Sequence, residues 1–301
     1  MERAFEGYSE FIPFFSDFQD CLQTPLPQHL RVNTLKISTL PLLRALERKG
    51  IFLKAALDSE TPLFLAPEGT SLGRWLEYAL GYIHPQALTS CAASLFLGPE
   101  TGSYVLDLCA APGGKTSHLS QLMKGEGLIV ANELHRKRHM PLMNTLSRLG
   151  VLNAVLTGYP AQEFPFRGKF DYVLADVPCS GEGTFRYGRD HFPEKTRGSR
   201  PNVWETQRRI ILRGFDLLKE GGQMLYATCT YNPEENESVV AHLQKHRDAE
   251  IMKIDSPLPF LPGLSGWNRE TYGEDMKNAA RFYPHYVNSV GFFMAKIGRR
   301  R

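Results

Sequence analysis

The chain has 301 residues, of which 42% are hydrophobic and 22% charged, and its formal net charge is +3. These values are ordinary for a soluble globular protein, and the length suits one large domain with a smaller one. No run of about 18 apolar residues occurs, and acids stand where a signal peptide is basic, so we expect neither a membrane span nor a secretory leader. The five cysteines are scattered and include no Cys-x-x-Cys pair, which argues against disulfides and zinc. We therefore expect a cytoplasmic protein without a bound metal.

The first hundred residues are predicted to form a small mixed α/β module. Prolines divide this stretch into short pieces (Pro25, Pro27, Pro41, Pro62 and Pro67). Between them, residues 40–49 are predicted to form a helix, and residues 51–53 and 63–65 are short apolar runs. We expect this module to span residues 1–100 and a main domain to span residues 101–301.

In the main domain, strands alternate with helices. Strands are predicted at residues 104–108, 128–132, 154–156, 170–176 and 223–228, and helices at 115–123, 202–219 and 233–246. A further helix is indicated by Leu142, Leu146 and Leu149, which repeat at helical spacing. Gly221 and Gly222 are expected to close the helix before them, and Pro233 to begin the last helix. This alternation predicts a parallel sheet with helices on both faces, which binds ligands beyond the carboxyl ends of its strands.

The loop after the first of these strands is the expected ligand site. It reads Asp107-Leu-Cys-Ala-Ala-Pro-Gly-Gly-Lys-Thr116. A phosphate-binding P-loop requires glycine where Cys109 stands, and a dinucleotide fingerprint requires Gly-x-Gly-x-x-Gly, so the loop meets neither pattern. S-adenosylmethionine has no pyrophosphate, and small residues at 110–114 let the backbone approach an amino acid and a ribose. Glu133, at the end of the second strand, is placed to accept hydrogen bonds from both ribose hydroxyls. The alternative is a glycine pair that only forms a tight turn.

Two cysteines follow neighbouring strands of the predicted sheet. Cys179 lies in Asp176-Val-Pro-Cys-Ser-Gly-Glu-Gly183, and Cys229 lies in Ala227-Thr-Cys-Thr-Tyr-Asn-Pro-Glu-Glu-Asn236. Buried cysteines are common core residues, and that interpretation suits Cys91 and Cys109. It suits Cys179 and Cys229 less well, because each stands where a strand gives way to a loop, on the rim expected to hold the ligand.

Such a pair fits methylation at carbon 5 of a pyrimidine. That carbon becomes nucleophilic only after a thiolate adds to carbon 6, and a base must then remove the proton from carbon 5 so that the thiolate can leave. A free cysteine has a pKa near 8.5 and is only about 3% thiolate at pH 7. A site that lowers this pKa to about 7 therefore gains roughly fifteen-fold in thiolate. An acid such as Asp176 can hold the cytosine amino edge and feed a proton to the ring nitrogen.

Together these residues resemble the Nop/Sun (Fmu-type) RNA 5-methylcytosine methyltransferases. The resemblance covers most of the chain and lies in seven segments taken in order: 31–36, 81–86, 107–116, 176–181, 228–230 with 234–237, 281–285 and 291–293. It implies a Rossmann-like methyltransferase domain, with a mostly parallel seven-stranded sheet and helices on both faces. The module at 1–100 would then bind RNA, and residues 101–301 would form the S-adenosylmethionine-dependent catalytic domain.

The resemblance also implies a role for each site residue. Cys229 would be the nucleophile on carbon 6, and Cys179 would assist release of the methylated base. The loop that would line the cofactor comprises Cys109, Ala110, Ala111, Pro112, Gly113, Gly114 and Lys115. Glu133 would hold the ribose, and Asp176 would face both cytosine and cofactor. For Lys115, an exposed lysine at a helix start is the alternative.

One departure concerns the adenine end of the cofactor site. The family usually has an acid after the third strand that meets the adenine amino group. The counterpart here is Pro160 or Ala161, and neither is acidic. Gln162, Glu163 or a backbone carbonyl would have to take its place.

The leading hypothesis is thus an enzyme that methylates cytosine in RNA, with ribosomal RNA favoured over transfer RNA because the N-terminal module is short. An RNA-binding assembly factor is the rival from another class, but a pure binder needs neither cysteine. A DNA cytosine methyltransferase is a second rival, and it would use Cys179 as the nucleophile. The basic stretch 185–201 and the basic tail are candidate RNA contacts. We expect a monomer.

Overall fold

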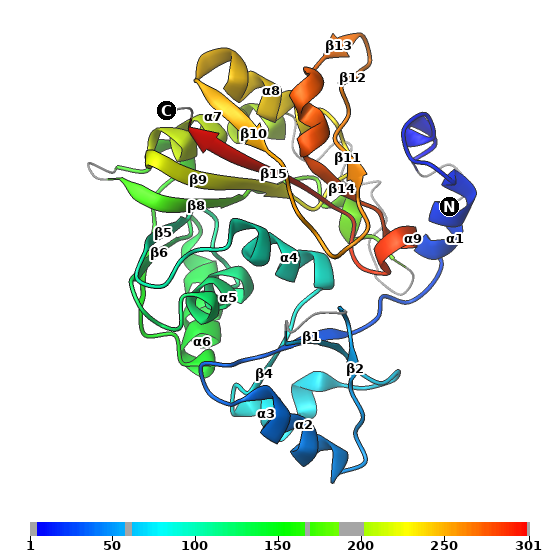
Figure 1. Ribbon diagram of the computed structural model, residues 1–301, viewed down its shortest axis with the longest axis vertical. Coiled ribbons are helices and arrows are strands. Elements are labelled where there is room, and N and C mark those ends of the chain that lie inside the picture. The colour runs from blue at the N-terminus through cyan, green and yellow to red at the C-terminus, as the bar shows by residue number, and fades with distance from the viewer. Residues whose placement is uncertain (1–4, 58–61, 166–168, 187–201, 300–301) are drawn as a thin grey trace.

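A computed structural model describes residues 5–57, 62–165, 169–186 and 202–299 (Figure 1). The basic stretch expected to contact RNA lies outside the described residues from 187 to 201, as do residues 300 and 301 of the tail.

The main sheet has nine strands among the described residues, in the order β11-β14-β15-β9-β8-β5-β6-β7, with β10 paired to β15. The strands are β5 (Tyr104–Asp107), β6 (Leu128–Asn132), β7 (Ala154–Thr157), β8 (Phe170–Asp176), β9 (Leu218–Thr228), β10 (Ala249–Met252), β11 (Leu261–Pro262), β14 (Ala280–Phe282) and β15 (Phe292–Arg299). The pairs from β9 through β8, β5 and β6 to β7 are parallel, whereas β15 is antiparallel to β9. The Rossmann-like α/β class is confirmed, although the sheet is broader than the seven strands expected.

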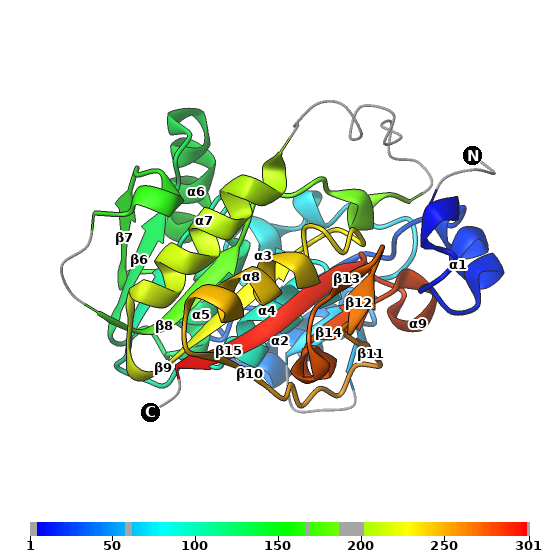
Figure 2. The ribbon, with the colours of Figure 1, turned by 90° about the horizontal axis from the view of Figure 1, so that it is seen from above.

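Helices cover both faces of this sheet (Figure 2). On one face lie α7 (Val203–Asp216) and α8 (Glu237–His246), and on the other lie α4 (Leu88–Leu97), α5 (Gly114–Leu122) and α6 (Arg136–Leu149). The expected stripe of Leu142, Leu146 and Leu149 is the buried side of α6. Burial of such apolar faces provides the main driving force for folding and fixes the strand ends that carry the site.

A second sheet of four strands lies beside the main one (Figure 1). Its order is β2 (Lys54–Ala55), β3 (Leu63–Leu65), β1 (His29–Val32) and β4 (Ile83–Pro85), and α2 (Thr39–Glu47) and α3 (Leu76–Ala79) accompany it. The fully buried Arg31 of β1 donates hydrogen bonds to Ser117 (2.9 Å) and Gln121 of α5. These contacts fasten the small sheet to the helix that follows the predicted cofactor loop.

The N-terminal residues lie apart from this small sheet. Helix α1 (Phe15–Leu22) lies beside α9 (Pro284–Val287), at the right-hand edge of the view in Figure 1. Its Phe18 is fully buried and packs edge-on against Tyr231, two residues after Cys229. The N-terminal residues therefore buttress the strand end that carries this cysteine. The short hairpin β12 (Gly266–Trp267) and β13 (Glu270–Thr271) forms a separate pair.

Two predicted boundaries are wrong. Helix α7 ends at Asp216 rather than at Lys219, because Leu218 already pairs with Phe170 of β8, and the glycines expected to close the helix lie inside β9. A side chain at Gly222 would place its Cβ 3.0 Å from the Asp171 carbonyl oxygen, so this glycine allows close strand approach. Helix α8 begins at Glu237, four residues after Pro233, because residues 233–236 form a turn. Across the described ranges no helix is both long and apolar enough to cross a lipid bilayer.

Candidate active site

The loop between β5 and α5 is folded tightly against the strand ends. Ala110 donates its backbone N–H to the carbonyl of Asn132 at 2.8 Å, and Gly113 donates to the carbonyl of Ala110 at 2.8 Å. Gly113 has a φ of 101°, and a Cβ there would lie 3.0 Å from Leu142, so a side chain would be strained and crowded. Helix α5 begins directly at Gly114. The backbone of residues 109–114 is thus brought to the edge where β5 and β6 end.

Glu133 lies at this edge, immediately after β6. Its side chain is 3% exposed. It accepts a hydrogen bond from the backbone N–H of His135 at 2.8 Å and forms an ion pair with Arg138 at 3.0 Å. Arg138 also donates to the carbonyl of Ala111 at 2.6 Å, which ties the carboxylate to the loop. Each carboxylate oxygen has a second lone pair, so Glu133 can still accept hydrogen bonds from a ribose.

Lys115 and Asp176 form an ion pair of 2.7 Å between α5 and the end of β8. Their side chains are 15% and 26% exposed, so Lys115 is not the solvent-exposed lysine considered as the alternative. Burial alone would lower the pKa of Lys115, but the carboxylate of Asp176 outweighs it and the pKa is raised overall. Lys115 therefore stays a cation, 5.3 Å from the centre of the Phe292 ring.

The two cysteines meet at the same edge, with their sulfur atoms 3.3 Å apart. Cys229 directly follows β9, and Cys179 follows the neighbouring strand β8 by three residues. The sulfur–sulfur hydrogen bond lowers the pKa of Cys229 although burial opposes this shift. The same hydrogen bond, together with burial, raises the pKa of Cys179 well above its ordinary range. The opposite directions of the two pKa shifts thus favour a Cys229 thiolate that accepts a hydrogen bond from the Cys179 thiol.

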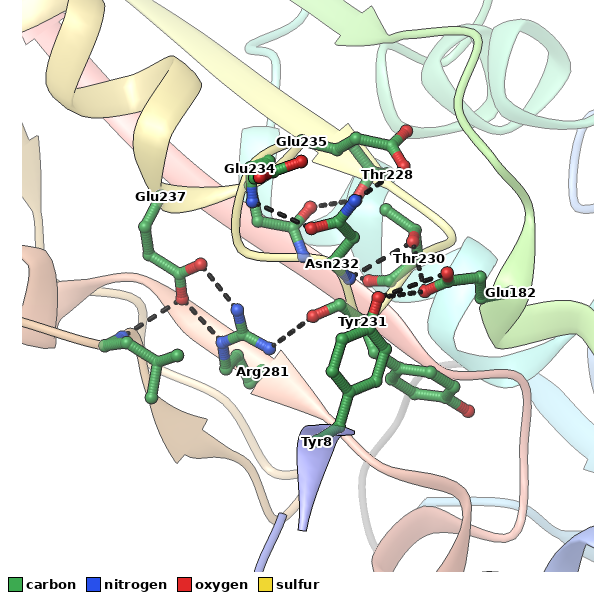
Figure 3. A network of polar contacts seen from close by, with 12 residues as sticks. Tyr8, Glu182, Thr228, Thr230, Tyr231, Asn232, Glu234, Glu235, Glu237 and Arg281 are labelled. Atoms are coloured by element: carbon green, nitrogen blue, oxygen red, sulfur yellow. Dashed lines mark hydrogen bonds and ion pairs between the residues drawn. The ribbon is translucent and has the colours of Figure 1, made fainter. Parts of the chain in front are cut away.

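Hydrogen bonds between the two loops hold this pair in place. Gly183 donates its backbone N–H to the carbonyl of Cys229 at 2.8 Å. Ser180 donates its hydroxyl hydrogen to Thr230 at 2.7 Å. Thr230 donates to Glu182 at 2.9 Å, as Figure 3 shows. Tyr8 from the N-terminal residues donates to Glu182 at 3.2 Å. Each residue that follows a cysteine is therefore bonded to the loop of the other.

The charges around Cys229 have opposite effects on its thiolate. Asp176 raises the pKa of Cys229, and Lys115 lowers it. We expect Lys115→Met to raise the pH of half-maximal Cys229 alkylation by about one unit, because the variant removes the cation and leaves Asp176 unpaired. Site-resolved mass spectrometry of iodoacetamide labelling across pH measures this value. Lys115→Arg keeps the cation and should label like the wild type. An unchanged pH of half-maximal Cys229 labelling in Lys115→Met would contradict the role of Lys115 in lowering the pKa of Cys229.

Asp107 is a further candidate site residue, which the sequence did not single out. It is 1% exposed at the end of β5, where Thr116 donates to its Oδ2 at 2.7 Å, and its Oδ1 has no hydrogen-bond partner among the described residues. Burial raises its pKa to about 7. An acid at the end of the first strand was visible in the sequence, but its unpartnered oxygen depends on how the loop folds. Cys109 is partly buried beside it, and desolvation together with the carboxylates of Asp107 and Asp176 raises the pKa of its thiol well above normal.

The loop after β7 supplies no acid for an adenine. Glu163 is exposed and pairs with Arg209 at 2.9 Å on the surface. Ala161, one of the two expected counterparts, is buried in the main core. The side chain of Asn132 binds this loop, donating to the carbonyl of Tyr159 at 2.9 Å and accepting from its N–H at 3.0 Å. Glu163 was one possible replacement for the acid that meets the adenine amino group. Its carboxylate is instead paired with Arg209.

The residues present fit S-adenosylmethionine. The unpartnered oxygen of Asp107 is an acceptor for an ammonium group, Glu133 is an acid beside the loop, and small side chains at 110–114 leave room for backbone contacts. In the part of the chain that the structure describes, no three His, Cys, Asp or Glu side chains form a group that could hold a metal ion.

The sequence and the fold match known proteins. Residues 94–298 match the family described as "16S rRNA methyltransferase RsmB/F". A Pyrococcus abyssi protein named tRNA (cytosine(49)-C(5))-methyltransferase is 32% identical over 301 residues, covering 100% of this chain and 96% of the relative. A human protein named 28S rRNA (cytosine(4447)-C(5))-methyltransferase is 33% identical over 288 residues, covering 93% of this chain but 35% of the relative.

A crystal structure of a methyltransferase homolog protein from Pyrococcus horikoshii has a similar fold. Its TM-score is 0.82 at 34% sequence identity, over 94% of this chain and 90% of that chain. The chain therefore resembles archaeal proteins over nearly their whole length, and about a third of the longer human relative.

Proposed function

The chain belongs to the family of methyltransferases described as 16S rRNA methyltransferase RsmB/F, and from this membership we propose that it transfers a methyl group from S-adenosylmethionine to carbon 5 of cytosine in RNA. Membership confirms the Nop/Sun resemblance of the motifs. The observation that carries the proposed chemistry is the pair of cysteines 3.3 Å apart at the rim of the methyltransferase sheet. A protein that only bound RNA would have no use for such a pair.

The proposed cofactor site consists of the 109–115 loop, Asp107, Glu133 and Asp176. S-adenosylmethionine, when bound, supplies the methyl group as an electrophile. Asp107 would accept hydrogen bonds from its ammonium group, and Glu133 would accept them from its ribose hydroxyls. Lys115 holds Asp176 at the point where the cofactor site meets the cysteines.

The proposed reaction begins at Cys229. Its thiolate adds to carbon 6 of the cytosine, forming a carbon–sulfur bond and moving an electron pair toward carbon 5. Carbon 5 would then take the methyl group, with the sulfonium of S-adenosylmethionine left as a neutral thioether. A base removes the proton from carbon 5, the carbon–sulfur bond breaks, and Cys229 leaves as a thiolate. The thiol of Cys179 donates a hydrogen bond to this departing sulfur. The same hydrogen bond stabilises the Cys229 thiolate before the reaction.

For the substrate, we propose ribosomal RNA, bound with the help of the module at residues 1–100. The short module favours this choice. Transfer RNA is the second candidate, because the relative named as a tRNA methyltransferase matches this chain over almost its full length.

The test is transfer of a labelled methyl group by the purified protein. Ribosomal and transfer RNA from cells that lack the gene are incubated separately with labelled S-adenosylmethionine, and the nucleosides are then separated. We expect label in 5-methylcytosine from the ribosomal pool. Label in the transfer RNA pool alone would show that transfer RNA, and not ribosomal RNA, is the substrate. No label in either pool would refute the proposed reaction.

A further inference from the structure

Glu235 is a buried carboxylate for which the proposed reaction has no role so far. It lies in the turn between β9 and α8, and the residue is 2% exposed. Across the described ranges, no lysine, arginine or histidine forms an ion pair with it, and its contacts are to neutral donors. Burying a charge without a counter-charge is costly unless hydrogen bonds compensate. Such a group is a strong candidate for a task beyond packing.

The hydrogen bonds of Glu235 bracket Cys179 on both sides. Its Oε2 accepts from the backbone N–H of Ser180, the residue after the cysteine, at 2.9 Å. The same oxygen accepts from the side-chain amide of Gln207 at 3.0 Å. That amide also donates to the carbonyl of Pro178, the residue before the cysteine, at 2.9 Å. The carboxylate thus fixes the backbone that aims the Cys179 thiol.

Charge around the cysteine pair is arranged unevenly. The charged groups that act on Cys229 are Lys115 and Asp176, which form an ion pair with each other. Cys179 faces Cys229 and the unpaired Glu235, and both act to raise the pKa of its thiol. The remaining titratable groups on this side, Tyr226 and Glu182, supply no positive charge, and the nearby Glu235 helps to raise their pKa values as well. Among the described residues, the cation of Lys115 acts on Cys229, whereas the charged group that acts on Cys179 is the anion of Glu235.

We propose that Glu235 is a positioning residue that keeps Cys179 in its thiol form and aimed at Cys229, so that Cys179 can donate a hydrogen bond to the departing thiolate. This role rests on the proposed function, because it matters only if Cys229 must leave a covalent adduct. Without the negative charge, Cys179 would lose its proton more readily. Two adjacent thiolates would then repel each other, and no donor would be left to assist release.

The test compares Glu235→Gln, a neutral variant of the same shape, with Glu234→Gln. Glu234 is the exposed neighbouring acid, so its variant changes the net charge equally. Initial rates of iodoacetamide labelling across pH are resolved for each cysteine by mass spectrometry. In Glu235→Gln we expect the pH of half-maximal Cys179 labelling (the Cys179 midpoint) to fall by about one unit, because the negative charge beside the thiol is gone. In Glu234→Gln the Cys179 midpoint should stay at the wild-type value. A folded Glu235→Gln with a wild-type Cys179 midpoint would overturn the proposal.

If Glu235→Gln does not fold, Glu235→Asp replaces it. This variant keeps the charge but withdraws it by one methylene group, so the Cys179 midpoint should still fall, and an unchanged value would count against the proposal. Labelling requires neither RNA nor cofactor, so this result is independent of whether the protein methylates RNA. With RNA, Glu235→Gln should also hold more covalent adduct at steady state than the wild type. Adduct at the wild-type level would refute the role in release.

Discussion

Cys229→Ala is expected to abolish methyl transfer and to form no covalent complex with RNA, whereas Cys179→Ala should form the complex and accumulate it. The Cys229 sulfur is the one whose pKa the site lowers, so its removal eliminates the nucleophile. We expect activity to fall on the order of 10⁴-fold or more, as when other enzymes lose a nucleophile. In Cys179→Ala the attack can proceed, but the departing thiolate loses its hydrogen-bond donor.

Denaturing gels of each variant incubated with RNA and S-adenosylmethionine measure this difference. Trapped complex runs more slowly than free protein. Cys91→Ala is the matched control, because Cys91 is a buried cysteine of α4 that packs in the hydrophobic core. It should retain activity and trap nothing. A complex that persists in Cys229→Ala would instead make Cys179 the nucleophile, as in DNA cytosine methyltransferases.

Much of the sheet was predictable because its central strands are short apolar runs. The boundaries of β6 and β8 agree with the predicted ranges to the residue. Helix α4 was missed for the opposite reason. It is apolar on nearly all sides and packs against both the main sheet and α5, so it shows no helical periodicity against a polar face. The glycines in β9 were misread because glycine after a helix and glycine at a close strand approach look alike in a sequence.

The site was predictable in its members but not in its contacts. Cys179 and Cys229 could be assigned to neighbouring strand ends, because parallel strands end at one edge of the sheet. Their 3.3 Å separation depends on the loops, through bonds such as that of Ser180 to Thr230, which join residues 50 positions apart. Glu235 was visible as part of a motif, but its position behind Cys179 depends on the turn before α8. No local pattern carries such long-range information.

A buried ion pair between Arg281 and Glu237 supports the loop after Cys229. Removing the arginine should destabilise the whole protein. Arg281 is 2% exposed and forms a two-pronged ion pair with the fully buried Glu237 (Figure 3). Its guanidinium also donates to the carbonyl of Tyr231 at 3.0 Å. Burial would lower the pKa of Arg281, but Glu237 outweighs this effect and raises it. Arg281→Met would leave Glu237 buried without a counter-charge, at a cost of about 3–5 kcal/mol in the free energy of unfolding.

Denaturant unfolding of Arg281→Met and of the double variant Arg281→Met with Glu237→Gln tests this prediction. The double variant removes both charges, so it should lose less stability than Arg281→Met alone. Lys277→Met, at a lysine outside this pair, is the control and should change stability little. If the double variant were less stable than the single one, the penalty would come from lost packing rather than from an unpaired charge. Tyr231 lies two residues after Cys229. Loss of the Arg281 contact should therefore make the position of Cys229 less well defined even in protein that is still folded.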